Sequence, residues 1–120
     1  MSVKIFSKGE SATALIEGDI DHHTAKEIRE NIDAYIENNI PKILYLDFSE
    51  VRFMDSSGIG LIMGRFKLIN SLKGKLMVIN IPKNLERMIM LSGLTSLGIF
   101  EKGGKKTNVR SSKRNEYKFF

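Results

Sequence analysis

Two short runs of alternating hydrophobic and polar positions open the chain. Residues 3–7 and 12–17 contain β-branched or aromatic side chains, and Lys8-Gly9-Glu10-Ser11 separates them. A glycine among polar residues between two such runs is typical of a hairpin turn. We therefore predict two antiparallel strands, over residues 3–7 and 12–17.

From Thr24 the apolar positions recur at helical spacing. The apolar face consists of Ala25, Ile28, Ile32, Tyr35 and Ile36. The charged face consists of Lys26, Arg29, Glu30, Asp33 and Glu37. Such a division predicts an amphipathic helix. Thr24 and Glu27 have the spacing of a capping box, and Asp21 is a second candidate for the cap. Asn38-Asn39-Ile40-Pro41 ends the helix.

A buried strand and a second helix follow. Residues 42–48 form a compact, mostly apolar run, which suits a central strand buried on both faces. A helix is then predicted from about Ser57 to Leu72, ending at Lys73-Gly74. Its expected core stripe consists of Ile59, Ile62, Met63, Phe66 and Ile69.

The remaining apolar segments predict a strand, a helix and a final strand. Residues 75–81 are a strand, and Pro82 precedes a helix that closes at Ser92-Gly93. The inner positions of that helix are Leu85, Met88 and Ile89, with Met90 and Leu91 as further core candidates. Residues 97–100 predict a last short strand.

The predicted order is β-β-α-β-α-β-α-β. Strands that alternate with helices after an initial hairpin indicate an α/β domain with a mostly parallel central sheet and helices packed on it. A chain of 120 residues, 42% of them hydrophobic, can bury one core but is too short for two. We therefore expect a single domain.

Most of the net charge of +5 lies at the C-terminal end. Residues 102–120 contain seven basic residues and one acid, so residues 1–101 are close to neutral. We expect a folded domain over residues 1–101 and a basic tail over 102–120 that is mobile or orders on a partner. Tyr117, Phe119 and Phe120 lie among the basic residues, so nucleic-acid binding by the tail is an alternative function.

Composition also narrows the location and the chemistry. There is no cysteine, which excludes disulfides and thiolate metal sites. The N-terminus has no apolar signal-peptide region, and no stretch is apolar enough to span a membrane. We expect a soluble, cytoplasmic protein without a membrane interaction.

The segment Asp55-Ser56-Ser57-Gly58 joins the buried strand to the second long helix. Sites in open α/β sheets gather at the carboxyl ends of strands. The simplest interpretation is helix capping, but one helix needs one cap and three candidates stand in a row. A phosphoryl group on a serine here adds roughly −1.5 to −2 charges, and a helix N-terminus accommodates an anion. The segment therefore suits a phosphorylation switch.

The three glycines that follow, Gly58, Gly60 and Gly64, each cost a helix about 1 kcal/mol relative to alanine. They permit close approach of a backbone, either within the domain or from a bound protein. Their spacing nearly matches a dinucleotide-binding fingerprint, but the third glycine comes one residue late and the strand ends too early. We expect no cofactor.

Catalysis and metal binding have little support. Ser56 could be combined with Asp21 and with His22 or His23, but the Gly-x-Ser-x-Gly pattern is absent and no other histidine is available as a base. The histidine pair has no companion cluster of ligands. We predict no enzymatic activity and no metal site.

Three motifs, taken together, indicate a known family. Gly18-Asp19-Ile20-Asp21-His22-His23-Thr24-Ala25, then Phe53-Met54-Asp55-Ser56-Ser57-Gly58-Ile59-Gly60 with Gly64-Arg65, then Ser92-Gly93-Leu94 resemble the STAS-domain anti-sigma factor antagonists, also called anti-anti-sigma factors. The likeness extends over roughly residues 3–101 and points, within that family, to the anti-sigma-F factor antagonists of spore-forming Firmicutes. The relatives end in an amphipathic helix, whereas residues 101–120 show no apolar stripe.

The resemblance implies a function in partner switching. The unphosphorylated protein would bind an anti-sigma factor that is also a serine kinase, and so release a sporulation sigma factor. The kinase would phosphorylate Ser56 with its own ATP, and a PP2C-type serine phosphatase would reverse this. A STAS module of a general stress-response pathway is the alternative. The implied partner-binding residues are Asp21, Asp55, Ser57, Gly58, Ile59, Gly60 and Leu61.

Overall fold

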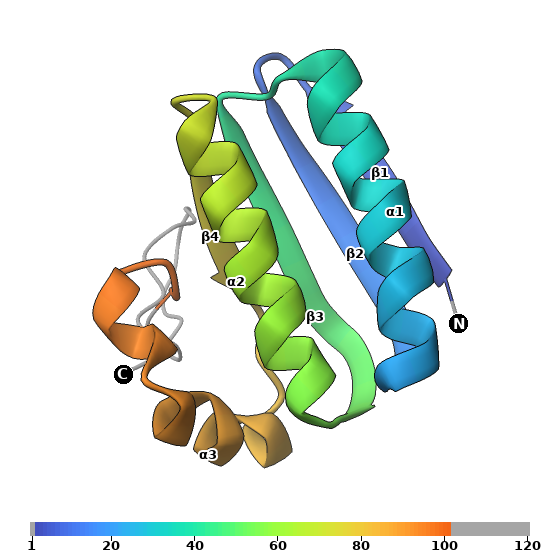
Figure 1. Ribbon diagram of the computed structural model, residues 1–120, viewed down its shortest axis with the longest axis vertical. Coiled ribbons are helices and arrows are strands. Elements are labelled where there is room, and N and C mark those ends of the chain that lie inside the picture. Colours follow the sequence, from blue (N-terminus) through green and yellow to red (C-terminus); the bar gives the residue numbers. More distant parts are fainter. Residues whose placement is uncertain (1, 102–120) are drawn as a thin grey trace.

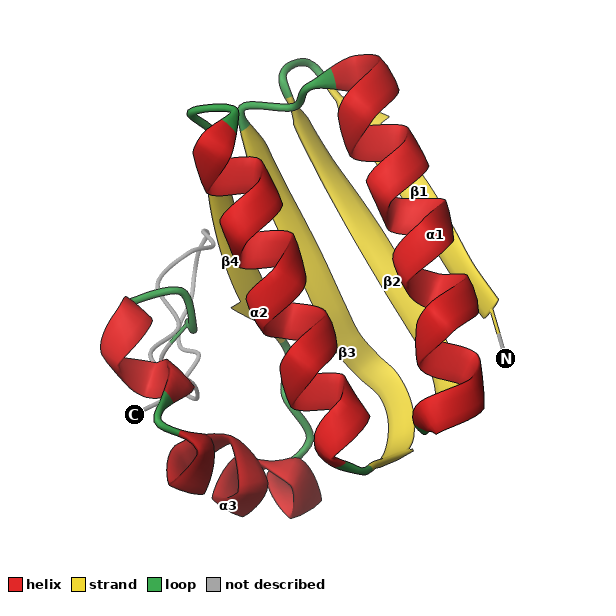
Figure 2. Cartoon of the chain, viewed as in Figure 1, coloured by secondary structure: helices red, strands yellow, loops and turns green. Residues whose placement is uncertain are grey.

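A computed structural model describes residues 2–101, so the predicted basic tail lies outside the described residues. The secondary structure alternates as predicted for most of its length (Figure 2). The elements are β1 (Ser2–Lys8), β2 (Ser11–Ile20), α1 (His22–Asn39), β3 (Ile43–Met54), α2 (Ser56–Ser71), β4 (Lys75–Ile79), α3 (Lys83–Ser92) and a 3₁₀ helix (Leu94–Leu97).

The four strands form one mixed sheet in the order β1-β2-β3-β4 (Figure 1). β1 is antiparallel to β2, and β2, β3 and β4 are parallel to one another. The α/β class, the N-terminal hairpin and the mostly parallel sheet are therefore confirmed. Antiparallel neighbours need only a short turn, whereas each parallel pair requires a crossover, which α1 and α2 provide.

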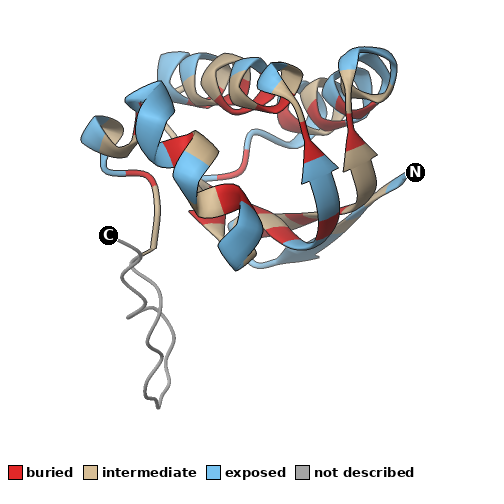
Figure 3. Ribbon diagram, turned by 90° about the horizontal axis from the view of Figure 1, so that it is seen from below, coloured by how far each residue is buried: buried red, intermediate tan, exposed pale blue. Residues whose placement is uncertain are grey.

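The core lies between the sheet and the two long helices, which pack on the same face (Figures 1 and 3). Leu44, Leu46 and Phe48 of β3 point to this face and are fully buried. Ile43 and Tyr45 alternate with them and are only half-buried. The prediction that this strand is buried on both faces is therefore wrong, because both crossover helices cover one side.

The C-terminal part departs from the predicted strand over residues 97–100. The 3₁₀ helix extends to Leu97, and of the predicted strand only Phe100 makes a β-bridge, to Val78 of β4. Met90 and Leu91 are also not core residues, since 55% and 75% of their surfaces are exposed. The inner face of α3 consists of Leu85 and Ile89, and the successive 100° turns of a helix carry the next two positions away from it.

β3 is longer than predicted and does not pair evenly with β2. The register shifts twice, between Leu15 and Glu17 and between Gly18 and Asp19, and each shift inserts one extra residue into β3. Such bulges bend the strand locally. Gly18 has a φ of 103°, a conformation that favours glycine. The bend is visible at the carboxyl end of β3 (Figure 1).

The glycines of α2 have different surroundings. A Cβ on Gly58 would overlap the side chain of Met54, which is itself 1% exposed. A Cβ on Gly60 or Gly64 would meet no atom within 4 Å. Packing inside the domain therefore explains Gly58 and leaves the other two without a packing reason.

This contrast predicts opposite effects of two alanine substitutions. Gly58→Ala should lower the free energy of unfolding by about 1–3 kcal/mol because the buried Met54 must move. Gly60→Ala should raise it by about 0.5–1 kcal/mol, because alanine is the better helix former and has room. Urea denaturation measures both. Equal effects of the two substitutions would contradict the packing explanation.

Candidate functional site

Two strand ends meet at one edge of the sheet. Ile20 pairs with Met54 in the parallel register, and the backbone N–H of Asp55 donates to the carbonyl of Ile20 at 3.1 Å. An aspartate follows each strand directly, and a long helix follows each aspartate. α1 and α2 therefore begin side by side at the lower edge in Figure 1. Loops at this edge are where sites in α/β sheets gather.

Asp21 caps α1. Its Oδ1 accepts from the backbone N–H groups of His23 and Thr24, both at 2.9 Å, and the Thr24 hydroxyl accepts from the Asp21 N–H at 2.9 Å. This reciprocal pair is a capping box, but it is shifted by three residues from the predicted pair of Thr24 and Glu27. Asp21, the second candidate in the sequence, is the cap.

Asp55 caps α2, without a reciprocal partner among the described residues. Its Oδ1 accepts from the backbone N–H of Ser57 at 2.7 Å. Of the three capping candidates in the sequence, Asp55 is therefore the cap. Ser56, the first residue of the helix, is exposed, and its hydroxyl makes no hydrogen bond to any residue within 2–101. The hydroxyl is free for chemistry because a carboxylate satisfies the helix end.

The other predicted partner-binding residues divide by accessibility. Gly60 is exposed, and Ile59 is half-buried. Gly58 and Leu61 are buried in the domain, with Leu61 4% exposed. Gly58 and Leu61 therefore lie beneath the accessible surface and pack inside the domain. The predicted core stripe of α2 is corrected accordingly, because Leu61 lies deeper than Ile59.

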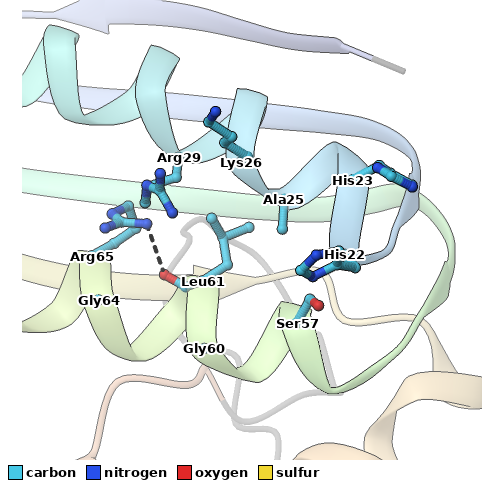
Figure 4. A pocket seen from close by; sticks show the side chains of 10 residues that line it. All are labelled: His22, His23, Ala25, Lys26, Arg29, Ser57, Gly60, Leu61, Gly64 and Arg65. Atoms are coloured by element: carbon cyan, nitrogen blue, oxygen red, sulfur yellow. Dashed lines mark hydrogen bonds between the residues drawn. The ribbon is translucent and has the colours of Figure 1, made fainter.

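A groove of about 570 Å³ runs between the first turns of α1 and α2 (Figure 4). His22 lies beside Ser57 at one end, and Arg29 lies beside Arg65 further along. The full lining is His22, His23, Ala25, Lys26, Arg29, Ser57, Gly60, Leu61, Gly64 and Arg65. The groove therefore begins next to the exposed serine and follows both helices away from the sheet edge.

Arg65 links the two helices and was missed as a core residue. It is 5% exposed, and its Nε lies 2.7 Å from Oδ1 of Asp33, a residue that the sequence pattern had placed on the outer face of α1. Burial lowers the pKa of Arg65, while the charge of Asp33 opposes that effect and the nearby charge of Arg29 adds to it. The signal in the sequence was an arginine one turn after Leu61, on the buried side of the helix.

Within residues 2–101, no group of three or more histidine or acidic side chains could hold a metal ion. No helix of the same residues is both long and apolar enough to cross a membrane. The rings of His22 and His23 pack edge to face at 5.7 Å on the first turn of α1. This edge of the sheet therefore combines two capped helix N-termini, the exposed Ser56 hydroxyl and a groove lined by basic residues. Such an arrangement is typical of a binding surface.

Comparison with known proteins gives the family. A model of the STAS domain matches residues 13–105. An anti-sigma F factor antagonist from Paenibacillus polymyxa is 37% identical over 79 residues, covering 66% of this chain and 68% of the relative. An anti-sigma-B factor antagonist from Listeria monocytogenes is 30% identical over 83 residues, covering 68% and 71%.

Solved structures agree. The anti-sigma factor antagonist SpoIIAA in its unphosphorylated form aligns with a TM-score of 0.72 at 25% identity, over 82% of this chain and 85% of that one. SpoIIAA from Bacillus in its phosphorylated form aligns with a TM-score of 0.66 over 82% and 88%. The chain belongs to the STAS-domain family and, within it, to the anti-sigma factor antagonists.

The cap of α1 predicts a pH dependence of stability. The hydrogen bond from the Thr24 backbone is the largest cause that lowers the pKa of Asp21 below its ordinary value of 3.8. A carboxylate with a lowered pKa stabilises the fold fully above its unfolded pKa and loses that contribution as the pH falls through the lowered value. Asp21→Asn keeps a good cap that does not titrate.

The natural protein should have a higher free energy of unfolding than Asp21→Asn at pH 5. We expect this difference to become smaller as the pH is lowered from 5 to about 2. Urea titrations at several pH values measure it, and the other carboxylates cancel because both proteins contain them. A difference that stays constant over this range would contradict the role of the Asp21 charge.

Proposed function

We propose that this protein binds an anti-sigma factor while Ser56 is unmodified, and that phosphorylation of Ser56 by that partner, acting as a serine kinase, ends the interaction. The observation that carries the proposal is the exposed hydroxyl of Ser56, which has no hydrogen-bond partner within residues 2–101. A kinase needs such an accessible hydroxyl. A PP2C-type phosphatase would restore it, and all of these reactions would take place in the cytoplasm.

The charge of the surface supports a switch without refolding. The carboxylates of Asp21 and Asp55 already lie at the N-termini of the two neighbouring helices, α1 and α2. A phosphoryl group on Ser56 adds roughly −1.5 to −2 charges beside them, and the N-terminus of α2 favours an anion. The fold is expected to persist while the surface becomes strongly negative. Structures of SpoIIAA in both forms, each similar to this chain, are consistent with that expectation.

The partner-binding surface proposed here keeps the residues of the sequence prediction in two roles. Asp21, Asp55, Ser57, Ile59 and Gly60 form its accessible part. The buried Gly58 and Leu61 hold the start of α2 in place. The proposed target is a sporulation sigma factor, because an anti-sigma F factor antagonist is 37% identical.

A general stress response is the second candidate, since anti-sigma-B factor antagonists are 30% identical. In either pathway the same serine and the same surface would be used, and only the kinase would differ. Neighbouring genes for a kinase and its sigma factor would distinguish the two.

The phosphorylation site can be tested directly. The protein is incubated with candidate anti-sigma factor kinases and ATP, and modified residues are mapped by mass spectrometry. We expect one phosphoryl group, on Ser56, that is absent in Ser56→Ala and retained in Ser57→Ala, because the Ser57 hydroxyl faces the groove. Phosphate on Ser57 or elsewhere, with Ser56 unmodified, would refute the site.

Ser56→Asp tests the charge mechanism. We expect this substitution to weaken binding to the same kinase at least about tenfold, which corresponds to about 1.4 kcal/mol. The circular dichroism spectrum and the melting temperature should stay close to those of the natural protein. Ser7→Asp, an equal charge on an exposed position of β1, is the control and should bind normally. Equal affinities of the two variants would argue against the mechanism.

A further inference from the structure

The groove between α1 and α2 is positively charged. None of its ten lining residues is acidic, whereas His22, His23, Lys26, Arg29 and Arg65 are basic. The only one of these with an ion pair inside residues 2–101 is Arg65, which binds Asp33. Lys26 and Arg29 are exposed and have no such pair. Unpaired cations in a concave surface attract an anionic occupant.

The shape of the groove suits a polypeptide segment. Gly60 and Gly64 lie on the α2 side, and an added Cβ at either position would meet nothing within 4 Å. These glycines cost the helix about 1 kcal/mol each, although the domain leaves room for a methyl group at both positions. They leave space for the backbone of an incoming chain. On the α1 side, His22 and Arg29 are separated by about 10 Å along the axis, a distance that roughly three extended residues cover.

The chain's own C-terminal segment does not have the right charge. Residues 102–120 carry seven basic residues and one acid, so they would be repelled by this lining. An acidic segment must therefore come from another molecule. The groove begins at Ser57, the neighbour of Ser56, so it is continuous with the surface proposed above for the anti-sigma factor.

We infer that this groove docks an acidic segment of the anti-sigma factor, with its carboxylates on Lys26 and Arg29 and its backbone against Gly60 and Gly64. This inference rests on the proposed function for the identity of the partner. It also gives the switch a physical cause. A phosphoryl group on Ser56 places negative charge at the mouth of the groove and repels the acidic segment.

The groove can be tested without the partner. The probe is a synthetic peptide with three glutamates alternating with alanines, and its match has glutamines in their place. Amide NMR spectra of the ¹⁵N-labelled protein are recorded during titration to millimolar peptide. We expect shifts centred on Lys26, Arg29, Gly60 and Gly64 with the acidic peptide, and none with the glutamine peptide.

Two double variants locate the effect. Lys26→Glu/Arg29→Glu should weaken peptide binding at least about tenfold. Lys8→Glu/Lys67→Glu makes the same change in net charge at exposed positions outside the groove and should bind as the natural protein does. Equal binding of the two peptides, shifts centred elsewhere, or equal weakening in both variants would overturn the inference. Displacement of the peptide by micromolar ATP would also overturn it, because the groove would then be a small-anion site.

The kinase identified by Ser56 phosphorylation provides the second measurement. We expect Lys26→Glu/Arg29→Glu to bind this kinase at least about tenfold more weakly than Lys8→Glu/Lys67→Glu does. Phosphorylation of Ser56 together with normal binding by the groove variant would refute the groove alone. Peptide binding in the groove together with an unmodified Ser56 would refute the proposed function alone.

Discussion

The pairing of the last residues of β2 and β3 is the constraint on which the rest of the structure depends. A backbone hydrogen bond from Asp55 to Ile20 joins the two strands at the point where both end. Because the strands are parallel, both helices start at this edge. Both crossovers step in the same direction along the sheet, from β2 to β3 and from β3 to β4, and right-handed crossovers in one direction lie on the same face. Two extra residues in β3 bring its end back level with that of β2. The free serine and the groove both follow from this meeting of strand ends.

The ion pair between Arg65 and Asp33 acts at the next level, between the helices. A buried guanidinium is costly unless it is paired and hydrogen-bonded. Here the Asp33 carboxylate supplies the countercharge, and the Leu61 carbonyl accepts a hydrogen bond from Nη1 at 3.4 Å. The pair connects α1 and α2 beside Gly64, where α2 has no side chain to contribute. It therefore helps to hold the helices together next to a groove that packing does not fill.

The periodic spacing of hydrophobic residues predicted the helices and most strands, because an element that is buried on one face must repeat its apolar residues at the period of that element. The same spacing could not predict the two bulges of β3, because a bulge depends on the register with a neighbouring strand that is distant in sequence. It also failed where a single position decides the face, as for Met90, Leu91 and Asp33. Local chemistry misassigned the cap of α1 and left three candidates for the cap of α2. Thr24, Ser57 and the two aspartates are all good capping residues, and only the strand ends select among them. The apolar pattern placed the start of α2 within one residue of Ser56, where the helix begins, but the burial of Gly58 and Leu61 needed the structure.

The use of aspartate as the cap would separate the stability of the helix from the proposed regulation at Ser56. If Ser56 itself capped α2, a phosphoryl group would replace a hydroxyl that the helix end required. With Asp55 in that place, the Ser56 hydroxyl contributes no hydrogen bond within residues 2–101, so its modification removes none. In the proposed function, a phosphoryl group on Ser56 would then change only the charge at the mouth of the groove. The proposed switch would need no second conformation of this domain, because the added negative charge alone would repel an acidic partner segment.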